Sequence, residues 1–154
     1  QVVELLGDLE AAGLKHCLRL LHFHMGSQIS NVRDIATGMH EAVRYFESLI
    51  DAGAPIGIVD VGGGLGVDYE GSRSRSYCSI NYGLDQYASA IVEPLAAICR
   101  ERAIAHPRVV TEAGRAMTAH HAVLVANVTA VEETSAGSVM EVGDAPHPTL
   151  KHLR

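Results

Sequence analysis

The stretch Ile56-Gly57-Ile58-Val59-Asp60-Val61-Gly62-Gly63-Gly64-Leu65-Gly66 joins a short apolar run directly to a cluster of glycines. Nearly continuous apolar side chains are typical of a strand that is buried on both faces of a parallel sheet. The glycines allow a sharp turn and bring backbone N–H groups within reach of an anion. No Gly-Lys-Ser or Gly-Lys-Thr follows, so the loop is not of the Walker type. The stretch predicts a buried parallel strand that ends in an anion-binding loop.

Two further apolar runs, at residues 18–23 and 108–112, also end in polar motifs. The first leads into His22-Phe23-His24-Met25-Gly26-Ser27-Gln28 and the second into Glu112-Ala113-Gly114-Arg115. Apolar residues at helical spacing predict helices over 2–12, 33–51 and 84–102, the last with a kink or break at Pro94. Strands that alternate with helices in this way pair in parallel through helical crossovers.

Two architectures fit this alternation, a (β/α)8 barrel and a doubly wound sheet. A barrel draws its site from the carboxyl ends of several strands, whereas a dinucleotide-binding unit concentrates its glycines after the first strand. All three predicted strands end in a site-like motif, which favours the barrel. A barrel needs about 250 residues, and the chain has 154 and no initiator Met. We therefore expect an internal fragment that contains strands 6 to 8.

The pattern changes near residue 118. Residues 120–131 form a β-branched stretch with no helix after it, and the tail from residue 132 is polar and rich in Gly and Ser. We expect residues 1–117 to belong to the barrel and residues 118–154 to begin a β domain.

Composition excludes several classes of protein. Apolar residues make up 47% and charged residues 19%, as in a folded globular core, and the net charge of −6 disfavours nucleic acid or an anionic membrane as partner. The three cysteines are far apart and odd in number, so they form neither a disulfide framework nor a zinc-site spacing, and we expect a reducing, cytoplasmic setting. Among nine histidines only His120 and His121 are adjacent, and strand neighbours point to opposite faces. No metal site is predicted.

The third motif combines a carboxylate with a guanidinium. A surface ion pair beside a turn would explain Glu112 and Arg115 without any ligand. Beside the glycine loop a second interpretation gains weight, in which Gly114 allows close approach and the forked donor of Arg115 suits phosphate. Glu112 could then hold a proton on a heterocyclic nitrogen.

The first motif contains two histidines that share one strand face. A buried, hydrogen-bonded core histidine is the plain interpretation. A functional one is that the His24 imidazole lies beside a cofactor ring and the Ser27 hydroxyl points to a phosphate.

The three motifs, in this order, resemble those of the pyridoxal-phosphate decarboxylases of the alanine-racemase-like class (fold type III). Within that family, three longer strings look like the biosynthetic arginine decarboxylases: Asp68-Tyr69-Glu70-Gly71-Ser72-Arg73-Ser74, Ser79-Ile80-Asn81-Tyr82-Gly83-Leu84 and Thr118-Ala119-His120-His121. The resemblance runs from about residue 5 to residue 131. One departure is Ala113, where the family usually has Pro.

The resemblance implies a role for each matching residue. His24 would stack on the pyridoxal ring, and Glu112 would keep the pyridine nitrogen protonated, so both are the expected catalytic residues. The phosphate would be held by Ser27, Gly62, Gly63, Gly64, Gly114 and Arg115. A protonated ring accepts the electron pair that remains when an α-carboxylate leaves as CO2. The substrate would be L-arginine and the product agmatine, for polyamine biosynthesis.

The resemblance also implies parts that this sequence lacks. Such an enzyme forms a Schiff base through a lysine, and neither Lys15 nor Lys151 ends an apolar strand. We expect the fragment alone to be inactive. The family further implies a homo-oligomer with its active site at a dimer interface, and a possible Mg2+ requirement for which no ligand set is visible.

Two other functions remain open. Diaminopimelate decarboxylases share the His-x-Gly-Ser and triple-glycine motifs, so the same chemistry could serve another substrate. A barrel homologue that has lost catalysis is the third possibility, and a missing lysine in the complete reading frame would favour it.

Overall fold

The computed structural model describes residues 1–132; residues 133–154, with Lys151 among them, lie outside the described part. The elements, in chain order, are α1 Val2–Ala11, the 3-10 turn η1 Lys15–Cys17, β1 Leu20–His22, α2 Val32–Asp51, β2 Ile58–Asp60, α3 Leu84–Glu101, β3 Arg108–Val110 and α4 Gly114–Thr118. The three helices predicted before residue 118 are confirmed as α1, α2 and α3. The three predicted strands are confirmed as β1, β2 and β3, and each is shorter than predicted. In residues 1–132 no helix has both the length and the apolar character that crossing a bilayer requires.

The three strands form one parallel sheet in the order β1-β2-β3. His22 lies opposite Asp60, and Asp60 lies opposite Val110, so the strands end at one level. A further parallel bridge joins Ile29 to Leu65 in the loops beyond β1 and β2. The α/β class with parallel pairing is confirmed, and the polar motifs that follow the strands meet at one edge of the sheet.

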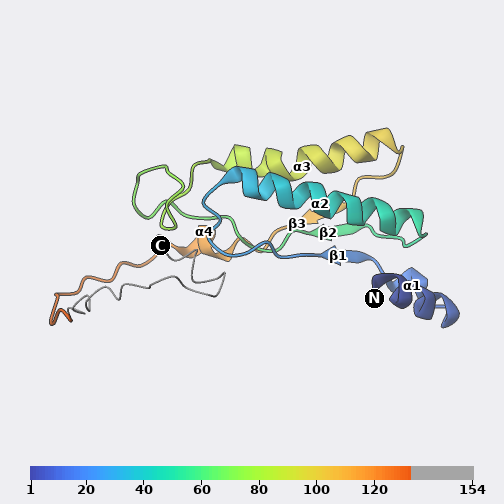
Figure 1. The fold of residues 1–154 in the computed structure, drawn as a ribbon, viewed down its shortest axis with the longest axis horizontal. Coiled ribbons are helices and arrows are strands. Elements are labelled where there is room, and N and C mark those ends of the chain that lie inside the picture. Colours follow the sequence, from blue (N-terminus) through green and yellow to red (C-terminus); the bar gives the residue numbers. More distant parts are fainter. Residues whose placement is uncertain (133–154) are drawn as a thin grey trace, which may run out of the picture. The chain divides into compact units, whose positions relative to one another are not determined.

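Helices α2 and α3 lie side by side on the same side of the sheet (Figure 1). Their apolar stripes face the strands and exclude water. The buried core combines these stripes with the inward residues of β2 and the loop after it: Ile35, Met39, Phe46, Leu49, Val59, Val61, Ile91 and Leu95. The hydrophobic periodicity that predicts the two helices is thus the packing surface that holds the sheet.

The two long helices have defined ends. The side chain of Asn31 accepts a hydrogen bond from the Arg33 amide at the start of α2, and Gly53, with φ of +77°, follows its last turn. The predicted break at Pro94 is wrong, because α3 continues through that residue. Proline removes one N–H from a helix, and burial of Ile91 and Leu95 beside it holds the remaining turns together.

The strand predicted over residues 120–131 is not formed in the described part of the chain, where residues 120–132 contain no helix or strand. A strand needs a neighbour for its backbone hydrogen bonds, and the sheet of residues 1–132 contains β1, β2 and β3 alone. The chain divides into compact units at residues 1–122 and 123–154, a few residues after the predicted boundary. The predicted β domain stays a prediction.

Candidate functional site

A cavity of about 290 Å3 lies where the loops after β1, β2 and β3 meet. Every predicted site residue except Gly62 lines it. The lining consists of His24, Ser27, Gln28, Gly63, Gly64, Leu65, Glu112, Ala113, Gly114 and Arg115. Residues that are up to 91 positions apart, from His24 to Arg115, therefore share one hollow at the carboxyl ends of the strands.

The Arg115 guanidinium is the cationic group of this cavity. Its Nη2 donates to the Ser27 hydroxyl at 3.0 Å, and its Nη1 donates to the Tyr69 hydroxyl at 3.2 Å. The first contact brings together two residues that the sequence predicts as phosphate ligands. Tyr69 was not predicted, and it fixes the second arm of the guanidinium fork.

Two residues of the glycine loop have backbone conformations that side chains disfavour. Gly62 has φ of +66°, and a Cβ there would lie 2.6 Å from the Phe23 carbonyl oxygen. Gly64 has φ of +111°, and a Cβ there would lie 2.9 Å from the Gly26 carbonyl oxygen. The glycines are therefore required by the close contact between the loops after β1 and β2.

Two amides of this loop already have acceptors. The Gly62 N–H donates to Asp60 Oδ1 at 2.9 Å, and the Gly63 N–H donates to His24 Nδ1 at 3.2 Å. An anion would have to replace these acceptors to use either amide. The anion-binding role of Gly62, Gly63 and Gly64 stays a prediction, and this geometry favours Gly64 among them.

The hydrogen bond from the Gly63 amide also orients His24. Because its Nδ1 accepts from Gly63, the proton of a neutral ring lies on Nε2. Both His24 and Gly114 line the cavity. A Cβ at Gly114 would meet no atom within 4 Å, so glycine there leaves open space beside Arg115.

Glu112 belongs to a group of three side chains with His22 and Asp60. The ligand atoms of these residues all lie within 4.8 Å of one another. His22 Nδ1 and Asp60 Oδ2 are 3.1 Å apart. An imidazole beside two carboxylates is not the all-oxygen set that Mg2+ prefers, and the group borders the cavity that holds the other predicted residues.

Gln28 joins two loops of the site. Its amide Nε2 donates to the Val67 carbonyl at 2.6 Å, and its Oε1 accepts from the Val67 N–H at 2.9 Å. Its backbone has φ of +53°, which is uncommon for a residue with a side chain. The Gln28 carboxamide thus pairs with the Val67 N–H and C=O as a neighbouring strand would, and it holds Ser27 beside the glycine loop. The spacing of 39 residues between the partners gives no sequence signal.

The loop after the glycines is folded onto itself. The Ser79 hydroxyl donates to Asp68 Oδ1 at 2.6 Å, and the Arg73 amide donates to Oδ2 at 3.1 Å. The Ser79 bond lowers the pKa of Asp68 below its usual value, against the opposing effect of burial. The neighbouring Tyr82 hydroxyl donates to the Ile29 carbonyl at 2.7 Å, and burial raises the pKa of this phenol. These contacts hold Tyr69 next to Arg115.

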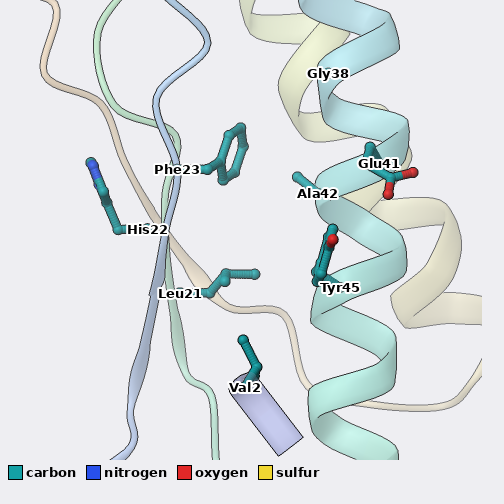
Figure 2. A pocket seen from close by; sticks show the side chains of 8 residues that line it. All are labelled: Val2, Leu21, His22, Phe23, Gly38, Glu41, Ala42 and Tyr45. Atoms are coloured by element: carbon teal, nitrogen blue, oxygen red, sulfur yellow. The ribbon is translucent and has the colours of Figure 1, made fainter.

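A second cavity, of about 320 Å3, lies between β1 and α2 and is lined mainly by apolar side chains. Figure 2 shows Leu21 and Phe23 pointing toward α2, while His22 points away from it. None of the predicted site residues lines this cavity. It is a gap in packing between strand and helix.

Comparison with known proteins gives a consistent family. Residues 3–119 match the family described as pyridoxal-dependent decarboxylase, pyridoxal binding domain. A biosynthetic arginine decarboxylase of Xanthomonas campestris pv. campestris is 61% identical over 154 residues, which are 100% of this chain and 24% of that protein. The crystal structure of the biosynthetic arginine decarboxylase of Campylobacter jejuni matches with a TM-score of 0.66 and 30% identity, over 74% of this chain and 19% of that one.

A diaminopimelate decarboxylase from Helicobacter pylori, solved with L-lysine, matches with a TM-score of 0.50 and 24% identity, over 71% of this chain and 26% of that one. At that identity the match shows a shared fold. The chain spans about a quarter of the length of the curated relative from Xanthomonas, at 24%.

Proposed function

The chain belongs to the pyridoxal-dependent decarboxylase family, and we propose that it supplies the phosphate-holding and ring-holding parts of an enzyme that converts L-arginine to agmatine and CO2. One observation carries the choice of arginine: the identity to an arginine decarboxylase extends over the whole chain at 61%. The three longer strings, around residues 68–74, 79–84 and 118–121, lie inside that match. Because the relative is about four times as long, the activity of a complete enzyme is part of the proposal.

We also propose that β1, β2 and β3 are strands 6 to 8 of a (β/α)8 barrel. The strands are adjacent in chain order and parallel, as successive barrel strands are. Helices α2 and α3, which connect the strands, both lie on the same side of the sheet, as the helices around a barrel do. The candidate site also lies at the carboxyl ends of the strands, where barrels place their chemistry.

Pyridoxal phosphate fits the groups around the cavity. A phosphate needs a concentrated set of donors, and Arg115 and Ser27 lie within hydrogen-bond distance of each other. The open space at Gly114 gives an anion room beside this pair. Tyr69 holds the other arm of the guanidinium, so the fork is already oriented before an anion arrives.

The ring would lie between His24 and Glu112. The Gly63 amide orients the His24 imidazole, and a carboxylate such as Glu112 accepts a hydrogen bond from the N–H of a pyridinium ring and so holds the proton on the nitrogen. When bound, pyridoxal phosphate supplies an electron sink for the bond that breaks as CO2 departs. The protein's own contribution is to orient the ring, hold the proton at its nitrogen and anchor the phosphate.

The lysine that such an enzyme needs would come from another part of the polypeptide. Lys15 lies in η1, before the amino end of β1, and its Nζ is 3.3 Å from Glu10 Oε1. The cavity lies beyond the carboxyl end of β1, so Lys15 lies at the opposite end of the strand from the cavity. We therefore expect these residues to need the rest of an enzyme for turnover.

We further propose a cytoplasmic, homo-oligomeric enzyme of polyamine biosynthesis, with its active site at a dimer interface and no nucleic acid or membrane partner. Support comes from the acidic net charge of −6 and from Cys17, Cys78 and Cys99, which are free thiols in the described structure.

The experiment is a chimera in which these 154 residues replace the matching segment of the Xanthomonas campestris arginine decarboxylase. The chimera is offered L-arginine, diaminopimelate, L-lysine and L-ornithine with pyridoxal phosphate, and CO2 release and product are measured. We expect arginine to be the preferred substrate and agmatine the product. The unmodified relative is the positive control.

Each other outcome is informative. Preference for diaminopimelate would favour the alternative substrate over arginine. A chimera that folds, as judged by circular dichroism and oligomeric state, but does not bind pyridoxal phosphate would favour the non-catalytic homologue.

A further inference from the structure

His22 and Asp60 are the last residues of β1 and β2, and they lie directly opposite each other in the sheet. Side chains alternate between the faces of a strand. Leu21 and Phe23 point toward α2, and His22 points the other way (Figure 2). The pair therefore lies on the face that the helices leave uncovered, next to the candidate site and outside the packed core.

A series of close contacts connects this pair to the backbone of Glu112. His22 Nδ1 lies 3.1 Å from Asp60 Oδ2, and the other carboxylate oxygen, Oδ1, accepts from the Gly62 amide at 2.9 Å. The Gly62 carbonyl in turn accepts from the Glu112 amide at 2.8 Å. A continuous chain of contacts thus runs from β1, through the glycine loop, to the backbone of Glu112.

The charges explain why such a chain matters. Asp60 and Glu112 lie close enough for their carboxylate oxygens and the His22 nitrogen to fall within 4.8 Å. Two carboxylates at this distance repel each other when both are ionised. His22 Nδ1 lies against one Asp60 oxygen and the Gly62 amide donates to the other, so Asp60 is engaged on both sides, while Glu112 lines the cavity.

We propose that His22 and Asp60 are a positioning pair that keeps the Glu112 carboxylate placed to face the nitrogen of the cofactor ring. The inference rests on the proposed function, in which Glu112 faces that nitrogen. His22 acts through Asp60 and touches neither cofactor nor substrate. Asp60 makes two contacts at once, since Oδ2 lies against His22 Nδ1 and Oδ1 accepts from the Gly62 amide.

The test compares two cofactors in the folded chimera. One is pyridoxal phosphate, and the other is its 1-deaza analogue, in which a C–H replaces the ring nitrogen. A residue that acts on the nitrogen changes the affinity for the first compound only. The variants are His22→Leu, which removes the donor, His22→Asn, whose amide nitrogen can replace Nδ1, and Asp60→Asn. His40→Gln, on the exposed side of α2, is the matched control.

We expect His22→Leu and Asp60→Asn to weaken pyridoxal phosphate binding about tenfold, the effect of losing one hydrogen bond to a charged group. Binding of the 1-deaza analogue should change less than about twofold. His22→Asn should recover most of the loss, and the double variant His22→Leu/Asp60→Asn should be no weaker than either single variant, since both interrupt one chain of contacts. His40→Gln should change neither affinity.

An equal loss for both cofactors would overturn the proposal and assign the pair a purely structural role. So would an unmodified chimera that binds the two compounds equally, because Glu112 would then not face the nitrogen. The proposed function fails separately: a chimera that discriminates between the two compounds but prefers a substrate other than arginine keeps the pair and loses the arginine assignment.

Discussion

The two faces of the three-stranded sheet differ in both packing and chemistry. On the face covered by α2 and α3, Val59 is 1% exposed and Phe46 is fully buried. On the other face His22 has a side chain that is 44% exposed, and Asp60 beside it is a charged group. The covered face sets the stability of the fold, and the proposed binding groups lie beside the uncovered face, in the loops at the carboxyl ends of the strands. Variants on the two faces should therefore separate a loss of stability from a loss of affinity.

The largest effect should come from the covered face. Phe46→Ala removes a fully buried ring and should lower the free energy of unfolding by about 3–5 kcal/mol through lost burial and a new cavity. Tyr45→Ala, at the adjacent and 54% exposed position of α2, is the control and should cost much less. Urea unfolding of the chain followed by circular dichroism measures both. Equal losses would contradict the assignment of the covered face.

A variant of Gln28, which joins the loops after β1 and β2, should lower the free energy of unfolding by an intermediate amount. Gln28→Leu leaves the N–H and C=O of the buried Val67 without their partner, and each unpaired group costs about 1–3 kcal/mol. Because Ser27 lies next in the chain, the affinity for pyridoxal phosphate should fall together with stability. Gln86→Leu, which removes only an exposed contact with the Gly83 amide, is the matched control. Unchanged stability in Gln28→Leu would show that the carboxamide does not hold the loops.

On the uncovered side, affinity should change without stability. Arg115→Lys cannot contact Ser27 and Tyr69 simultaneously as the guanidinium does. In the chimera we expect about tenfold weaker binding of pyridoxal phosphate, consistent with one lost charge-assisted bond. Pyridoxal, which lacks the phosphate, should bind unchanged. Arg44→Lys, on the exposed surface of α2, should alter neither affinity, and a loss for both ligands would argue against a phosphate contact.

The smallest effect should appear in the loop that holds Tyr69. The pKa of Asp68 is lowered in the folded state, chiefly by the Ser79 hydroxyl. This bond therefore contributes stability above the unfolded pKa of about 3.9, and the contribution is lost as the pH falls through the lower folded value. The unmodified chain should lose more stability than Asp68→Asn does when the pH falls through this range. Unfolding midpoints measured at several pH values check the difference, and identical pH profiles would contradict it.

The sequence pattern predicts the covered face well because burial leaves a periodic record. The stripe that includes Ile35, Met39 and Phe46 marks α2, and the apolar run at residues 56–61 marks β2. The same reasoning is wrong for residues 120–131, since apolar, β-branched side chains permit a strand but do not supply a neighbour to pair with. The predicted break at Pro94 is also wrong. The sequence pattern does not show whether burial of one helix face compensates for the hydrogen bond that proline removes.

The site residues likewise divide into those that the sequence predicts and those that it does not. His24, Ser27, Glu112 and Arg115 could be predicted because each lies in a motif directly after a strand. The contributions of Tyr69 and Gln28 could not, because each consists of a contact to a residue distant in sequence. Tyr69 meets Arg115 across 46 positions. Which of the loop amides are already engaged likewise depends on three-dimensional contacts that spacing does not reveal.

The central claim is that the loops after three adjacent strands form one site for pyridoxal phosphate. The most direct test is a crystal structure of the chimera with the cofactor bound. We predict that the phosphate lies within hydrogen-bond distance of the Arg115 guanidinium and the Ser27 hydroxyl, with the ring beside His24 and its nitrogen facing Glu112. A phosphate bound away from Arg115, or a ring nitrogen facing a residue other than Glu112, would contradict the account.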